Sequence, residues 1–135
     1  MSAVKELITS NDNTLSFGDY TLAEKTKKDG FQFNGASFKV KTFKEITKLE
    51  KDGSFFYESV PGTAVLNMTA TDEEIAFDVE APSDAEITVG VAEETTYEIV
   101  VDGNAVGEMK SNLGGKLTFS VELSGEPVKV VIRKK

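Results

Sequence analysis

The alternation of apolar and polar residues in the second half of the chain constrains the fold most strongly. The clearest case is LTFSVEL at 117–123, in which every second residue is apolar. Successive side chains of a β-strand point to opposite faces, so this period of two places the apolar set on a core and the polar set in water. The same alternation recurs at 64–70, 75–79, 87–91 and 128–132. These one-sided strands predict sheets that pack face to face.

Turn residues separate these segments where hairpins require them. Asp102-Gly103 lies between the apolar-rich segments 97–101 and 104–109, and an Asp-Gly pair readily adopts the positive φ angles of a type I′ turn. Further reversals are expected at three segments that contain Gly or Pro, namely 81–84, 113–116 and 124–127. The second half therefore predicts short antiparallel strands joined by tight turns.

The first half of the chain has a less regular pattern that still favours strands. Extended segments are expected at 15–22, 30–35 and 37–41. The segment 43–49 fits either a strand or a helical turn, and residues 2–9 predict one short helix because their apolar residues share a face. We therefore predict an all-β fold, an antiparallel β-sandwich of roughly nine to twelve short strands that forms a single domain over residues 1–135.

The residue types that the chain lacks exclude most catalytic and metal chemistry. Histidine and cysteine are both absent, which removes the commonest general base, the Ser-His-Asp triad, thiolate nucleophiles and His- or Cys-ligated metals. The loops 71–74 and 102–104 lack the alternating oxygen ligands of a calcium loop. We predict no metal, no cofactor and no enzymatic activity. The alternative is glycoside hydrolysis by a pair of carboxylates, which a chain with 23 acidic residues leaves open.

The charge distribution indicates which partners the protein avoids. Residues 54–107 contain twelve acidic residues and neither lysine nor arginine, in a chain of net charge −8. A surface of that sign repels phosphate backbones, so we expect no nucleic-acid partner. No apolar run reaches the roughly 18 residues that cross a bilayer, and residues 1–10 lack the apolar region of a signal peptide. We therefore predict an acidic cytoplasmic protein without membrane contact.

One hairpin supplies the candidate binding surface. A two-residue turn at 52–53 would place Phe55 and Tyr57 on one face of the hairpin and Phe56 on the opposite face. The polar residues expected beside the aromatic pair are Glu50, Lys48 and Glu58. If the pair is exposed, it forms a platform for a sugar ring or a protein partner; if it is buried, it belongs to the core of the sandwich.

A resemblance to a known group of proteins rests on the run KEITKLEKDGSFFYESVPGTAV at 44–65 and the segment LGGKL at 113–117. These segments resemble short, uncharacterised bacterial proteins, some of which carry the label endosialidase. The resemblance implies a small cytosolic domain and assigns no catalytic residue. Sialidases hold the substrate carboxylate with a cluster of arginines. This chain has a single arginine, Arg133, so we expect no sialidase activity.

These features together favour a non-catalytic binding or interaction module with a protein or carbohydrate partner. The alternative is a structural protein that self-associates, because small β-domains can pair through free strand edges. The C-terminal strand 128–132 is followed by three cationic residues, Arg133, Lys134 and Lys135. Terminal cations commonly protect an edge strand from aggregation, so we expect this strand at the edge of a sheet.

Overall fold

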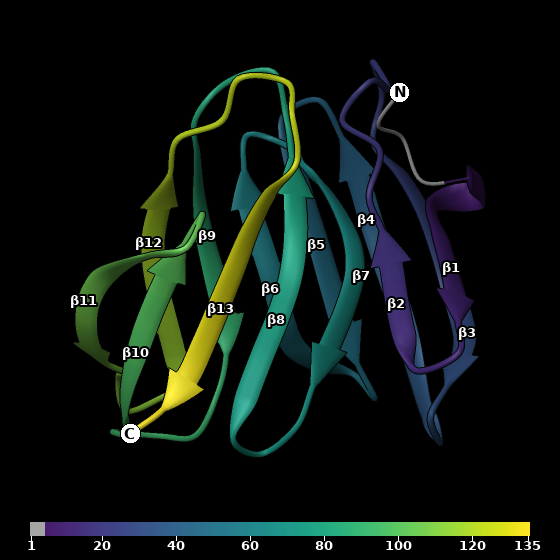
Figure 1. The fold of residues 1–135 in the computed structure, drawn as a ribbon. Coiled ribbons are helices and arrows are strands. Elements are labelled where there is room, and N and C mark those ends of the chain that lie inside the picture. Colours follow the sequence, from purple (N-terminus) through teal and green to yellow (C-terminus); the bar gives the residue numbers. More distant parts are fainter. Residues whose placement is uncertain (1–4) are drawn as a thin grey trace.

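Two antiparallel sheets packed face to face make up the computed structural model, which describes residues 5–135 (Figure 1). The strands of the seven-stranded sheet, in spatial order, are β1 (Ile8–Asn11), β2 (Thr14–Phe17), β7 (Ala64–Ala70), β8 (Glu74–Glu80), β13 (Val128–Lys134), β10 (Thr96–Val101) and β11 (Asn104–Lys110). Those of the six-stranded sheet are β12 (Lys116–Val121), β9 (Ala85–Gly90), β6 (Ser54–Val60), β5 (Ile46–Lys51), β4 (Ala36–Phe43) and β3 (Thr26–Phe33). The predicted all-β sandwich is confirmed.

The core lies between the two sheets and contains the alternating apolar residues. Along β4 and β12 every second residue is buried, as a period of two requires. One apolar cluster draws on both sheets, and its largest fully buried side chains are Tyr57, Phe17 and Phe77. The face of each sheet that is turned away from the core is called its outer face below.

The helix predicted over residues 2–9 is wrong where the structure describes these residues. Residues 2–4 lie outside the described part, a single 3₁₀ turn (η1) covers Lys5–Leu7, and β1 begins at Ile8. Ile8 pairs with Phe17 and is buried, so pairing with the sheet outweighs a weak helical pattern. Within residues 5–135 no helix is long and apolar enough to cross a membrane.

The C-terminal strand is not an edge strand, which corrects a second expectation. β13 lies inside the seven-stranded sheet and pairs with β8 on one side and β10 on the other. Arg133 lies opposite Glu74 of β8 and Glu98 of β10, and it forms ion pairs with both at 3.2 and 3.4 Å. This cation therefore pairs with neighbouring strands instead of protecting a free edge.

The hairpin turns follow the predicted chemistry. Asp102 and Gly103 have φ angles of 53° and 80°, and Asp52 and Gly53 have φ angles of 51° and 82°. Positive φ at both central residues is the type I′ geometry whose twist matches that of paired strands. The turn at 52–53 places the β5–β6 hairpin, and its aromatic run, at one end of the sandwich.

Candidate functional site

The β5–β6 hairpin departs from the predicted register after the second residue pair that follows the turn. Glu50 pairs with Phe55 as expected, but Leu49 then pairs with Tyr57 instead of Phe56. Phe56 is therefore the extra residue of a β-bulge, which displaces every later residue of β6 by one position. The prediction that Phe55 and Tyr57 share a face is wrong for this reason.

Tyr57 is fully buried in the core of the sandwich. Its ring contacts Phe17 and Phe77 edge-on, with centroid distances of 5.1 and 5.8 Å. Its hydroxyl lies 2.8 Å from Thr63 Oγ1. Burial raises the pKa of Tyr57 well above its ordinary value, and hydrogen bonds with Thr63 and Ser59 offset part of that rise. Tyr57 is thus a protonated core residue without access to a ligand.

A network of buried hydroxyl groups continues from Tyr57 toward β4 and β5. Thr63 Oγ1 lies 2.8 Å from Ser59 Oγ, and Thr47 Oγ1 donates to the Thr63 carbonyl at 2.8 Å while accepting from the Thr63 amide at 3.0 Å. Thr42 Oγ1 extends the network with a 2.8 Å contact to Thr47 Oγ1. In the described part of the chain every buried side-chain polar atom has a partner, so this network is structural.

The other four predicted site residues meet on the outer face of the six-stranded sheet. Lys48 lies directly opposite Glu58, and its ammonium is 4.0 Å from the carboxylate of Glu50. Phe55 is half-buried beside Glu50, and the ammonium of Lys116 lies 4.5 Å from the centroid of its ring. These residues form a flat mixed-charge surface and not an aromatic platform.

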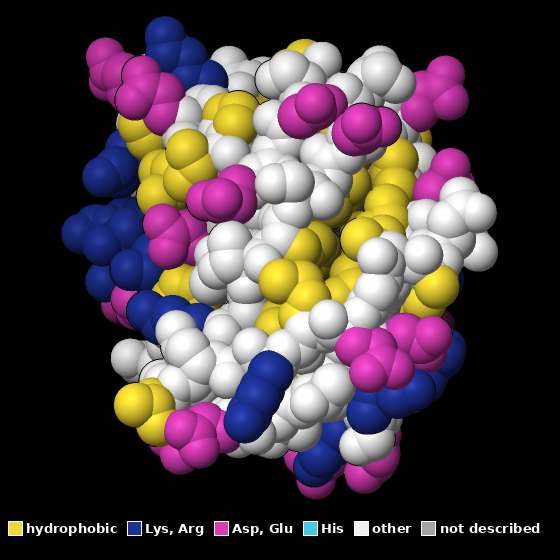
Figure 2. All heavy atoms as spheres, turned by 90° about the vertical axis from the view of Figure 1, so that its left-hand side faces the viewer, with side chains coloured by type: hydrophobic (Ala, Val, Ile, Leu, Met, Phe, Trp, Pro, Cys, Tyr) yellow, Lys and Arg dark blue, Asp and Glu magenta, His cyan; other side chains and the backbone are white. Residues whose placement is uncertain are grey.

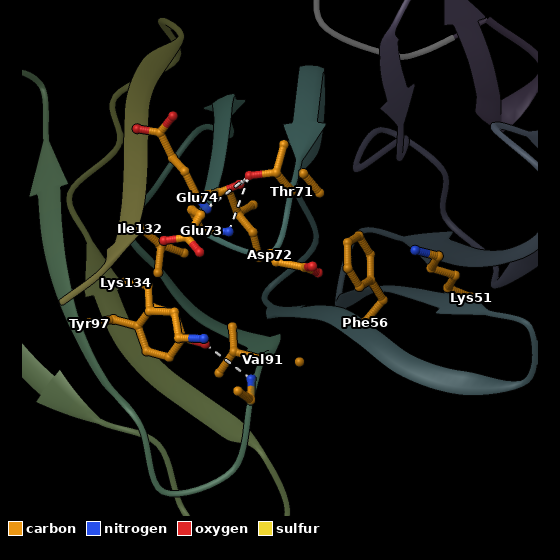
Figure 3. Close-up of a pocket in the computed structure, with 14 residues that line it drawn as sticks. Lys51, Phe56, Thr71, Asp72, Glu73, Glu74, Val91, Tyr97, Ile132 and Lys134 are labelled. Carbon is orange, nitrogen blue, oxygen red and sulfur yellow. Dashed lines mark hydrogen bonds between the residues drawn. The ribbon is translucent and has the colours of Figure 1, made fainter.

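A groove at the end of the sandwich is a better-shaped candidate (Figure 3). It consists of two hollows of about 550 and 470 Å³. Both are lined by Lys51, Phe56, Ala70 and Thr71, so they meet at the bulged residue Phe56. We call this feature the end groove. Each hollow lies within the ~300–1,000 Å³ range of small-molecule sites.

The centre of the end groove combines an aromatic ring with opposite charges. Figure 3 shows the ring of Phe56 between the carboxylate of Asp72 and the side chain of Lys51, whose ammonium is 5.8 Å from the ring centroid. Thr71 Oγ1 accepts hydrogen bonds from the amides of Glu73 and Glu74 at 3.2 and 3.1 Å. These bonds order the β7–β8 turn that carries Asp72 into the groove.

The two hollows differ in their linings. The larger one is bordered by the acidic turn 72–74 and by Lys134, with Tyr97 and Val91 at its far side. The smaller one has an apolar lining that includes Phe33, Phe38, Leu15 and Met68. The groove therefore offers apolar surface in one half and hydrogen-bonding groups in the other.

The sequence pattern did not predict this groove. The sequence places Phe56 on the face of the hairpin opposite Phe55 and Tyr57, and it offers the loop 71–74 only as a calcium loop that lacks the required ligands. The two turns that form the groove are far apart in the sequence, and only the packing of the two sheets brings them together. An aromatic run at a hairpin end was the one available signal.

No metal centre is formed by the described residues, in which no group of three or more His, Cys, Asp or Glu side chains is placed to hold an ion. No family model matches the chain, and searches of curated proteins and of solved structures found no match. The function is therefore inferred from the geometry of the molecule.

Proposed function

We propose that the protein is a non-catalytic binding module that holds an oligosaccharide in the end groove. The observation that carries this proposal is the position of Phe56, whose partly buried ring lies between a carboxylate and an ammonium group. The apolar C–H face of a sugar ring packs on an aromatic ring, and its hydroxyl groups donate to Asp72 and accept from Lys51.

The distribution of carboxylates in the groove favours binding over hydrolysis. Glycosidases need two carboxylates that flank the scissile bond, one as the acid and one as the base or nucleophile. The acidic residues that line the two hollows, Asp72, Glu73 and Glu74, all come from one turn. The opposite wall presents Phe56 and Lys51, so a bound sugar meets carboxylates from one side only.

The test is a ¹⁵N NMR titration of the protein with a panel of neutral oligosaccharides. We expect chemical-shift changes confined to the backbone amides of residues 51–56, 70–74 and 91–92. The dissociation constants should lie in the millimolar to micromolar range that a shallow groove supports, which corresponds to binding free energies of about −4 to −8 kcal/mol. Asp72→Asn and Phe56→Ala should each weaken binding at least fivefold. Phe55→Ala is the matched control, because it removes the neighbouring ring from the outer face and should leave binding unchanged.

Two results would contradict the proposal. One is the absence of shifts around Phe56 with every sugar tested, in a protein whose urea melt shows that it is folded. The other is cleavage of an oligosaccharide by the wild-type protein, detected as shortened products, which would replace binding by catalysis. Because Phe56 also contacts the core residue Phe38, with centroids 6.3 Å apart, Asp72→Asn serves as the variant that leaves the packing intact.

A further inference from the structure

The edge strands of the two sheets differ in how they are protected from the addition of another strand. Within residues 5–135 these strands are β1, β3, β11 and β12. β1 is only four residues long, and the register is interrupted in β3 between Lys28 and Phe31 and in β11 at the extra residue Val106. Short strands and β-bulges both hinder the pairing of a further strand. β12 has neither protection, because it pairs with β9 in regular register from Lys116 to Val121.

The hydrogen bonds at the start of β12 show which of its backbone groups face the open edge. Lys116 N–H donates to Asn112 Oδ1 at 2.9 Å, and the Lys116 carbonyl accepts from Asn112 N–H at 3.1 Å, so neither group is directed at β9. Residues of an antiparallel strand alternate between bonding to one neighbour and pointing to the other side. The N–H and C=O groups of Thr118 and Ser120 therefore point out of the open edge. No strand in the described part of the chain pairs with them there.

A hollow of about 440 Å³ lies beside this edge and is lined by residues of both sheets. Ser120 and Glu122 line it from the six-stranded sheet and the segment that follows β12, and the valines Val101, Val106 and Val128 line it from the seven-stranded sheet. The side chain of Val106 is 62% exposed. Figure 2 looks onto this side of the sandwich and shows hydrophobic side chains exposed in its middle. The open edge of β12 is thus accompanied by an apolar recess, which we call the valine hollow.

The charged residues that line the valine hollow are both acidic. They are Asp102 and Glu122, both exposed, and no lysine or arginine is among the lining residues. Neither carboxylate forms an ion pair with any residue from 5 to 135. Uncompensated charge of one sign at a recess favours a ligand of the opposite sign. A ligand that pairs with this edge is therefore expected to bring a positive charge to Glu122.

We infer that β12 binds an extended, basic segment of a partner polypeptide, which adds to the six-stranded sheet as a further antiparallel strand. Donor and acceptor groups alternate along the open edge at strand spacing, and an extended backbone matches this pattern residue by residue. Side chains of the added strand alternate between two faces, so apolar residues at every second position turn toward the valine hollow. A lysine or arginine at the start of the segment pairs with Glu122 and Asp102.

A second copy of the same chain fits this edge less well than a separate segment. Two β12 strands that pair antiparallel about their midpoint would set Lys116 of each copy opposite Glu122 of the other. The backbone groups of Lys116 are already bonded to Asn112, so only Thr118 and Ser120 would be left to pair. A segment of another polypeptide has no such loop beside it and can pair along the whole open edge.

A synthetic peptide titrated into the ¹⁵N-labelled protein tests the proposal. The probe is a capped hexapeptide with lysine at its first position, followed by alternating valine and threonine. We expect chemical-shift changes of the backbone amides of residues 118–122 and 104–106, and slower solvent exchange of the amides of Thr118 and Ser120, which gain acceptors. N-methylation of the peptide's threonines blocks the amides that face β12 and should abolish these changes. N-methylation of its valines is the matched control, because those amides point to solvent, and it should leave the changes in place.

Variants of the protein test the same edge from the other side. Ser120→Pro removes an amide that points out of the edge and leaves the bonds to β9 in place, so it should weaken peptide binding at least about tenfold. Ser120→Ala keeps the backbone and should bind as the wild type does, and urea melts establish that both variants are folded. Glu122→Gln should weaken binding of the lysine-bearing peptide at least about threefold.

Three results would overturn the proposal. One is the absence of changes at residues 118–122 of the folded wild-type protein with about 5 mM peptide. Another is binding that persists when the threonines of the peptide are N-methylated. The third is sedimentation of the protein alone as a dimer that Ser120→Pro dissociates, which would make a second copy the occupant of the edge.

Discussion

Replacement of Tyr57 tests the packing of the core and the bulge that places this residue there. The side chain is fully buried, with edge-on contacts to Phe17 and Phe77 and a hydroxyl 2.8 Å from Thr63 Oγ1. Tyr57→Ala removes the ring and the hydroxyl together, whereas Tyr57→Phe removes only the hydroxyl. The pair of variants therefore separates the contribution of the ring from that of the hydrogen bond.

The two substitutions should lower the free energy of unfolding by different amounts. Deletion of a buried aromatic ring costs about 3–5 kcal/mol, because transfer free energy is lost and a cavity remains. Loss of the hydroxyl alone should cost about 1 kcal/mol. The cost of the second change stays low because Thr63 Oγ1 keeps its 2.8 Å contact with Ser59 Oγ and is not left without a partner.

Urea denaturation followed by circular dichroism measures both changes. The free energy of unfolding of a small protein falls by about 1.5 kcal/mol per molar urea. Tyr57→Ala should therefore lower the unfolding midpoint by about 2–3 M urea, and Tyr57→Phe by less than about 1 M. Phe55→Ala, on the outer face of the sheet, should cost about 1 kcal/mol or less. A Tyr57→Ala variant no less stable than Phe55→Ala would show that Tyr57 faces solvent and that the bulge at Phe56 is absent.

Three further predictions concern pH, backbone packing and activity. Burial raises the pKa of Tyr57 in the folded state above its ordinary value of 10.0, so its contribution to stability is complete below pH 10 and is lost as pH rises above it. The free energy of unfolding from urea melts should therefore fall more between about pH 9 and pH 11 for the wild type than for Tyr57→Phe. Gly62→Ala should lower the free energy of unfolding by more than about 2 kcal/mol in the same melts, because a Cβ at Gly62 would overlap the backbone carbonyl of Phe43. A loss of less than about 0.5 kcal/mol would contradict this packing. Release of sialic acid from a polysialic acid substrate should not exceed the blank, because Arg133 is engaged by Glu74 and Glu98, and measurable turnover would refute this.

The strands that could be predicted from the sequence are those with one buried face. LTFSVEL at 117–123 alternates cleanly because β12 packs one face on the core and exposes the other, and Leu117, Phe119 and Val121 are all buried. The position of a strand within its sheet depends instead on which distant strand it meets. β13 has the same alternating pattern as an edge strand, and only its pairing with β8 and β10 distinguishes it.

The candidate site was harder to predict because a single inserted residue changes every orientation after it. In a strand with a period of two, a bulge at Phe56 reverses the faces of all subsequent residues relative to a regular hairpin. The residues Glu50 and Phe55 before the bulge lie where a regular hairpin places them, and Tyr57 after it does not. No local residue signals the bulge, since it follows from the pairing of Tyr57 with the buried Leu49.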